Sequence, residues 1–95
     1  MDNQDVYIKR LQVQMEEWEN EIERLRIKAD KASADAQIEY RKQLEELRKR
    51  QDEMQAQYEK LNRAGNDAWS DVRDGADKAW MEFDAAIKRA LTRFN

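Results

Sequence analysis

The side chains that usually perform catalysis are either missing from this chain or lack the neighbours that their chemistry needs. The 95 residues include no histidine and no cysteine, which removes the commonest general base, the commonest metal ligand and every thiol. The hydroxyl groups of Ser33, Ser70 and Thr92 therefore have no histidine to activate them. Carboxylates are abundant, but none has a predicted buried partner for proton transfer. We expect a protein that is not an enzyme and that needs no cofactor.

One short segment carries oxygen ligands of the kind that a cation site uses. The stretch GNDAWSD contains Asn66, Asp67 and Asp71, and calcium and magnesium bind carboxylate and amide oxygens that cluster in a loop. Asn66 or Asp67 equally suits the cap of a helix, where a short polar side chain accepts hydrogen bonds from backbone N–H groups. The helix start is the favoured interpretation, and no metal site is predicted.

The composition is typical of a charged helical protein. Charged residues make up 41% of the chain, proline is absent, and the only glycines are Gly65 and Gly75. The net charge of −3, with mixed signs, argues against nucleic acid as a partner. No apolar run reaches the roughly 18 residues that span a bilayer, and the start of the chain lacks a secretory signal pattern. These features predict a single cytoplasmic domain over residues 1–95.

The last third of the chain contains an eleven-residue repeat. The Ala-Trp pair at residues 68–69 recurs at residues 79–80, and Val72 recurs as Phe83. About eleven residues complete three helical turns, so the repeat places its large apolar side chains on one face of a helix over about residues 67–94. This predicted helix-packing or partner face consists of Trp69, Val72, Ala76, Trp80, Phe83, Ile87, Leu91 and Phe94.

A strip of small residues runs beside this face and makes the surface broad enough to contact two other helices. The small residues are Ala68, Gly75, Ala79, Ala86 and Ala90. Eleven-residue amphipathic repeats resemble those of exchangeable apolipoproteins and synucleins, which implies lipid binding. Residues 66–95 nevertheless hold five basic and six acidic residues, whereas helices that bind membrane surfaces are rich in Lys and Arg. Packing against protein is therefore favoured, and contact with a membrane surface is the alternative.

The first two thirds of the chain carry a heptad pattern of apolar residues, which is typical of a coiled coil. The predicted seam consists of Ile8, Leu11, Met15, Trp18, Ile22, Leu25, Leu44, Leu47, Met54, Tyr58 and Leu61. Between its halves the seam continues through small residues, Ala29, Ala32 and Ala36, and then Tyr40. Its phase slips by about one residue near position 36.

Two all-α architectures fit this seam. In the favoured one, a long helix over about residues 3–64 is followed by the helix at about 67–94, which folds back as an antiparallel hairpin after Gly65 in a left-handed conformation. So long a helix leaves its first half uncovered, which implies an antiparallel homodimer built of three-helix segments. The alternative is a monomeric three-helix bundle with a turn near residue 33. The segment KADKASADAQ favours the long helix because it contains no Gly, Pro or Asn.

Blocks of charge predict how the halves of the seam pair. The block at 16–23 is acidic and the block at 41–50 is net basic. They face each other if antiparallel partners have residue numbers that add up to about 65. In this register Trp18 meets Leu47, so the apolar seam and the charges agree. The same contacts can form within one chain or between two.

The order of these features resembles that of small bacterial coiled-coil proteins, some of them stress-induced. The residues that carry the resemblance are Tyr7, Ile8, Leu11 and Trp18 near the start, and Gly65 and Ala68-Trp69 after a Lys/Glu/Ala-rich middle. The resemblance covers nearly the whole chain and implies a cytoplasmic helical protein with no assigned biochemical activity.

The predicted function is that of a non-enzymatic coiled-coil protein, a scaffold, adaptor or stress-linked assembly partner that acts through self-association and helix packing. One alternative is a peripheral lipid-binding protein that uses the helix at 67–94. Another is a small accessory subunit that binds a larger protein complex through the same face.

Overall fold

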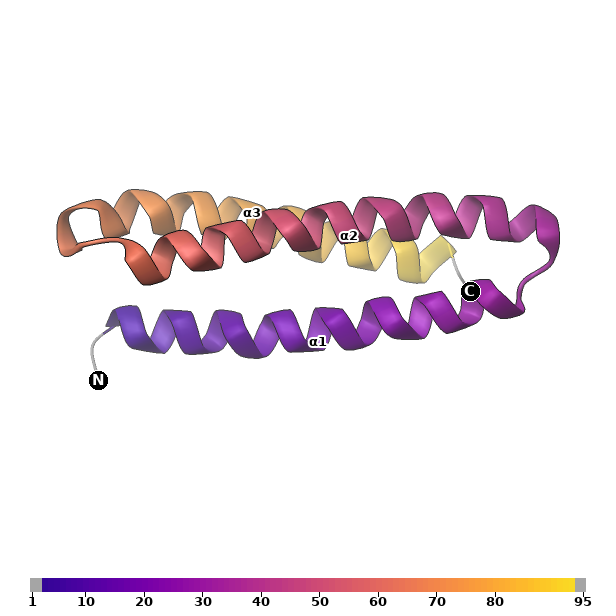
Figure 1. The fold of residues 1–95 in the computed structure, drawn as a ribbon, viewed down its shortest axis with the longest axis horizontal. Coiled ribbons are helices and arrows are strands. Elements are labelled where there is room, and N and C mark those ends of the chain that lie inside the picture. The colour runs from indigo at the N-terminus through magenta and orange to yellow at the C-terminus, as the bar shows by residue number, and fades with distance from the viewer. Residues whose placement is uncertain (1–2, 94–95) are drawn as a thin grey trace.

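The computed structural model describes residues 3–93, which form three α-helices joined by two short turns. The helices are α1 (Asn3–Lys31), α2 (Ala34–Arg63) and α3 (Asn66–Arg93). Figure 1 shows that α2 returns antiparallel to α1 and that α3 reverses direction again. The bundle measures 51 × 20 × 18 Å, as expected for helices of about 30 residues that rise about 1.5 Å per residue. The all-α class is therefore confirmed, in the form of the three-helix alternative.

In the single chain, the long helix predicted over about residues 3–64 does not form, because the chain turns at Ala32 and Ser33. Ser33 has an extended backbone (φ −61°, ψ 160°), and its hydroxyl oxygen accepts a hydrogen bond from the N–H of Ala36 at 3.4 Å. The side-chain amide of Gln37 donates to the carbonyl oxygens of Asp30 at 3.3 Å and Ala32 at 3.2 Å. A serine N-cap and a glutamine on the last carbonyls of α1 thus make a turn without Gly, Pro or Asn.

The second turn also differs from the prediction. The cap of α2, Ala64, is extended (φ −71°, ψ 135°), and Gly65 does not have a positive φ. The carbonyl oxygen of Gly65 accepts hydrogen bonds from the N–H groups of Ala68 at 3.1 Å and Trp69 at 3.0 Å. Gly65 therefore occupies the capping position of α3, and Asn66 is the first helical residue rather than the cap.

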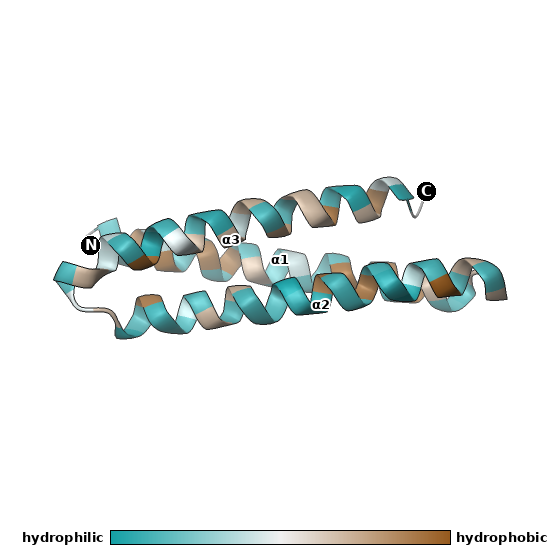
Figure 2. Cartoon of the chain, turned by 90° about the horizontal axis from the view of Figure 1, so that it is seen from above, coloured by the Kyte–Doolittle hydropathy of each residue, from teal (hydrophilic) through white to brown (hydrophobic). Residues whose placement is uncertain are grey.

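The three helices share one apolar core. Figure 2 shows hydrophobic and hydrophilic residues alternating along each helix, as expected where one side packs and the other is solvated. The buried residues are Leu11, Trp18, Ile22, Leu25, Ala29, Leu44, Leu47, Met54, Leu61, Trp69, Ala76, Phe83, Ala86, Ile87 and Ala90. The remaining seam residues, Ile8, Met15 and Tyr58, are partly buried against this core. No polar or charged residue is buried within residues 3–93.

One side-chain contact between α1 and α2 is offset from the predicted register by about one helical turn. The side-chain amide of Gln51 donates a hydrogen bond to Glu19 Oε2 at 3.2 Å, whereas the predicted register places Glu19 near residue 46. Cβ atoms lean toward the N-terminus of their own helix, so in an antiparallel pair contacting side chains do not lie at equal distances from the turn. The partner of Glu19 therefore differs from the one that the predicted register gives it.

Charge pairs also lie elsewhere than predicted. The interhelical ion pairs found within residues 3–93 join α2 to α3: Arg50–Glu82 at 3.0 Å, Arg89–Glu46 at 3.8 Å and Arg93–Glu39 at 2.8 Å. The acidic block at 16–23 pairs with arginines of its own helix, as in Arg24–Glu21 at 3.1 Å. Within the basic block, Arg50 thus pairs with α3. The pKa of Glu23 in the acidic block is lowered by its hydrogen bond with Arg26 and also by the nearby charge of Arg48, which belongs to the basic block.

Candidate packing face and binding cleft

The predicted face of α3 is turned into the bundle. Trp69, Ala76, Phe83 and Ile87 are buried, and Val72, Trp80 and Leu91 are partly buried against the core. Within the strip of small residues, Ala86 and Ala90 are buried, Ala79 is half-buried, and Ala68 and Gly75 are exposed. Phe94 lies outside the described residues. Contact between this face and a membrane would require α3 to leave the bundle.

Five aromatic rings connect α1 with α3, the two helices whose backbones approach each other least closely. Trp18 stacks on Phe83 with ring centroids 4.4 Å apart and planes 6° from parallel, and it meets Trp80 edge-on at 5.9 Å. Tyr7 meets Trp69 edge-on at 5.6 Å and Trp80 at 6.0 Å. Large rings thus fill the space between α1 and α3. Each ring pair stabilises the fold by more than the burial of its apolar surface alone. Tyr7 was absent from the predicted seam, although its position one residue before Ile8 places it beside that seam.

One polar contact accompanies this aromatic group. The Tyr7 hydroxyl donates a hydrogen bond of 2.5 Å to Asp77 Oδ1, and Arg73 lies 3.8 Å from the other carboxylate oxygen of Asp77. Burial, and then the hydrogen bond and negative charge of Asp77, raise the pKa of Tyr7 above its ordinary value near 10, while Arg73 opposes the shift. The folded state therefore holds the phenol proton more tightly than the unfolded chain does.

Replacing Tyr7 with Phe is expected to change how stability depends on alkaline pH. The pKa of Tyr7 is higher in the folded state than in the unfolded chain. The contribution of its hydrogen bond to the free energy of unfolding is therefore complete below pH 10 and is lost as the pH rises above 10. Hydrogen bonds to charged groups contribute about 1.5–3 kcal/mol, and this contact is only part-buried, so at pH 7 the Tyr7→Phe variant should lose an amount at the low end of that range. Urea unfolding of the wild type and of Tyr7→Phe should show that their difference in free energy of unfolding is smaller at about pH 11 than at pH 7.

The matched control for this experiment is Tyr58→Phe. Tyr58 is half-buried and makes no hydrogen bond within the described part of the chain, so its variant should follow the wild-type pH dependence. A gap between wild type and Tyr7→Phe that stays constant from pH 7 to pH 11 would contradict the proposed contact with Asp77.

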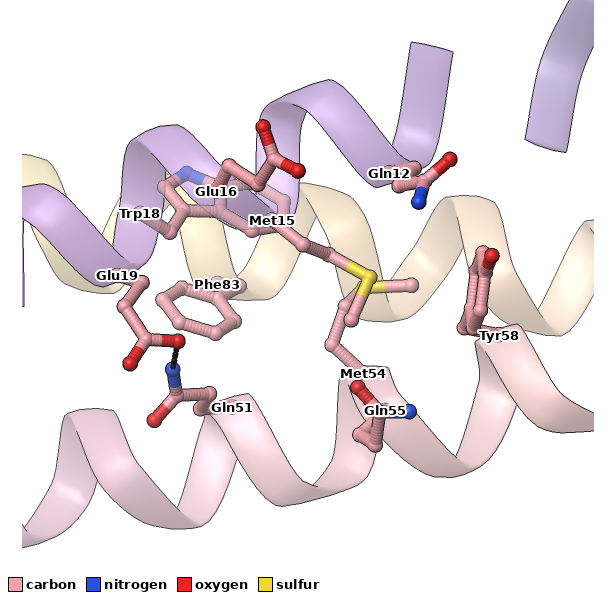
Figure 3. A pocket seen from close by; sticks show the side chains of 10 residues that line it. All are labelled: Gln12, Met15, Glu16, Trp18, Glu19, Gln51, Met54, Gln55, Tyr58 and Phe83. Atoms are coloured by element: carbon pink, nitrogen blue, oxygen red, sulfur yellow. Dashed lines mark hydrogen bonds between the residues drawn. The ribbon is translucent and has the colours of Figure 1, made fainter. Parts of the chain in front are cut away.

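A cleft of about 240 Å³ opens between α1 and α2. Figure 3 shows Met15 and Met54 meeting across it, with Trp18 and Phe83 at one end and Tyr58 at the other. Trp18, Met54 and Phe83 are core residues, whereas Met15 and Tyr58 are half-buried. The cleft therefore has an apolar and aromatic floor that the seam pattern did not predict, because the seam describes contacts and not the gaps between them.

Polar side chains form the rim of the cleft. They are Gln12, Glu16, Glu19, Gln51 and Gln55, and Figure 3 shows the hydrogen bond from Gln51 to Glu19. No lysine or arginine lines the cleft. Glu16 makes no hydrogen bond or ion pair within residues 3–93. The rim thus combines amide groups with negative charges that no basic residue of the cleft balances.

The residues considered for a cation site lie in the first two turns of α3. Asn66, Asp67 and Asp71 are exposed, and the Asn66 side-chain oxygen accepts a hydrogen bond of 3.4 Å from the Gln4 amide. Across the described range, no three acidic side chains gather as a metal site requires. In the same range, no helix combines the length and the apolar character that crossing a membrane demands.

Comparison with known proteins found no matching family model, no similar curated protein and no similar solved structure. The resemblance to small bacterial coiled-coil proteins therefore stays a prediction from the sequence. The function has to be argued from the geometry of the bundle.

Proposed function

We propose that this protein is a non-enzymatic structural protein that binds a second copy of itself by exchanging α1. In the exchanged dimer, α1 of each chain packs on α2 and α3 of the other chain, and α1 and α2 join into one helix. The contacts of α1 stay the same, so the dimer consists of two three-helix segments like the one described. The observation that carries this proposal is the turn between α1 and α2.

This turn has no residue that forbids a helix. It consists of Ala32 and Ser33, neither residue has a positive φ, and the φ of Ser33, −61°, already has the helical value. Only ψ at Ser33 must change for this residue to become helical. The side-chain hydrogen bonds of Ser33 and Gln37 that hold the turn are exposed or part-buried, and backbone hydrogen bonds of a continuous helix would replace them.

The apolar seam also supports exchange, because it passes through the turn. Leu25, Ala29, Ala32, Ala36 and Tyr40 follow one another at spacings of three or four residues, so a continuous helix would carry them on one face. Three of these five residues are alanines that lie where two antiparallel long helices would cross. Small side chains at that point let the two backbones approach closely.

The decisive variant is Ala34→Pro. Ala34 is exposed and is the first residue of α2, a position that favours proline, and the extended Ser33 suits the residue before it. In a continuous helix the same proline would stand in the interior, where it costs about 3 kcal/mol in each chain. Ala34→Pro should therefore keep the three-helix monomer and prevent the dimer.

The measurement is sedimentation together with small-angle scattering over a range of protein concentrations. We expect the wild type to form a dimer that contains a helix of about 60 residues, about 90 Å long, compared with 51 Å for the monomer. Ser33→Ala removes the capping hydrogen bond to Ala36, which only the turned form has. This variant should therefore raise the dimer fraction. The matched control is Asn66→Pro, because Asn66 is the first residue of α3. This variant should dimerise as the wild type does.

Two results would contradict the proposal. A wild type that stays monomeric at every concentration would exclude self-association. A dimer that survives Ala34→Pro unchanged would exclude exchange of α1 and leave side-by-side association.

A further inference from the structure

The cleft between α1 and α2 combines features that suit one chemical class of small molecule. Its floor includes the rings of Trp18 and Phe83 and the thioether of Met54, which are almost fully withdrawn from water. The half-buried Met15 and Tyr58 stand above this floor, and a thioether adapts to the shape of an apolar group. An apolar group therefore finds favourable contacts at Met15 and Tyr58, above the buried floor.

The charges on the rim of the cleft favour a cation. The charged residues of the rim are Glu16 and Glu19, and no basic side chain lines the cleft to balance them. Glu19 accepts the hydrogen bond of Gln51, whereas the carboxylate of Glu16 has no partner within residues 3–93. A cation near Glu16 would gain a charge-assisted hydrogen bond, and an anion would meet two like charges.

We infer that this cleft is a binding site for a small organic ammonium ion that carries one aromatic or alkyl group. The apolar group lies against Met15 and Tyr58, and the ammonium group lies at the Glu16 carboxylate. The cleft volume of about 240 Å³ is below the roughly 300 Å³ at which pockets for drug-sized ligands begin, so a ligand with a single ring fits best. The site is independent of the proposed dimer, because it forms wherever α1 packs on α2.

The test uses 2-phenylethylammonium as the probe, added to the whole chain and followed by NMR. Two comparison compounds keep its ring and change its end group: 2-phenylethanol is neutral, and phenylacetate is an anion. We expect saturable shifts of the Met15 methyl signal and of the Tyr58 ring signals at probe concentrations up to about 10 mM. Because of the Glu16 carboxylate, the ammonium probe should bind about tenfold tighter than the alcohol, and phenylacetate should not bind. The indole of Trp69 does not line the cleft and should not respond.

Variants locate the charge that the probe recognises. Glu16→Gln should lower the affinity for the ammonium probe about tenfold, to the level of the alcohol. Glu17→Gln is the matched control, because Glu17 is exposed and lines the surface between α1 and α3 instead. Both positions are exposed, so both variants should unfold at the wild-type temperature.

Three results would overturn the inference. The first is the absence of saturable shifts with the ammonium probe. The second is equal affinity for the ammonium and the alcohol, which would mean that the cleft selects only apolar groups. The third is equal loss of affinity in Glu16→Gln and Glu17→Gln, which would mean that the probe responds to the net charge of the protein and not to this site.

Discussion

Replacing Phe83 with Ala is expected to lower the free energy of unfolding by about 3–5 kcal/mol, the usual cost of deleting a buried aromatic side chain. Phe83 is 1% exposed and stacks on Trp18, with ring centroids 4.4 Å apart. Its ring helps to fill the wide gap between α1 and α3, so a smaller side chain leaves a cavity that neighbouring backbone cannot easily close. Because small domains have total stabilities of about 5–15 kcal/mol, the variant should be close to unfolding.

Urea unfolding, followed by circular dichroism and by tryptophan emission, measures this effect. Trp18 should become more exposed in the variant, so the emission of the folded state should shift to the red. The matched control is Met81→Ala, two residues away, because Met81 is 72% exposed and its loss should cost no more than about 0.5 kcal/mol. If Phe83→Ala were as stable as Met81→Ala, the stacked contact between α1 and α3 would not exist in solution.

The sides of the helices that face the core follow from the sequence, because burial repeats with the helical period. The buried leucines of α1 and α2 belong to the heptad seam, and Phe83 and Ile87 belong to the eleven-residue repeat. A residue's place in such a pattern depends only on its own helix, so no knowledge of the partner helix is needed. For this reason the all-α class could be predicted without the structure.

The turn between α1 and α2 could not be predicted by looking for helix-breaking residues. Ser33 caps α2 and Gln37 binds the last carbonyls of α1, yet both residues also occur inside helices. A serine followed by an acid, here Asp35 in the first turn of α2, is a helix-start pattern that would have indicated the break. Because the segment also lacks Gly, Pro and Asn, a search for helix-breaking residues favours the continuous helix.

The partners of charged side chains could not be predicted because they depend on all three helices at once. The basic block of α2 was assigned to the acidic block of α1, but Arg50 reaches Glu82 of α3 at 3.0 Å. Exposed ion pairs contribute little energy, so they follow the packing and do not direct it. The cleft likewise depends on side chains from three helices, since Trp18, Met54 and Phe83 meet only in the folded bundle.

Replacing Ala76 with Leu is expected to lower the free energy of unfolding by about 1–3 kcal/mol, because it overpacks a filled interior. Ala76 is 0% exposed and lies on the predicted packing face of α3. The methyl group of Ala76 leaves no room for three further carbon atoms, so Leu must either adopt a strained rotamer or push the helices apart. Separation would also weaken the Arg50–Glu82 ion pair, although that exposed pair adds little to the total.

The matched control is Ala85→Leu, since Ala85 belongs to the same helix and is exposed. Leu and Ala have similar helix propensities, so this control should stay within about 0.5 kcal/mol of the wild type. Urea unfolding of both variants separates the cost of overpacking from any effect on the helix itself. If Ala76→Leu were as stable as Ala85→Leu, the small residues of α3 would not be held inside the bundle. That outcome would favour an α3 that detaches, which is the arrangement that contact of its apolar face with a membrane requires.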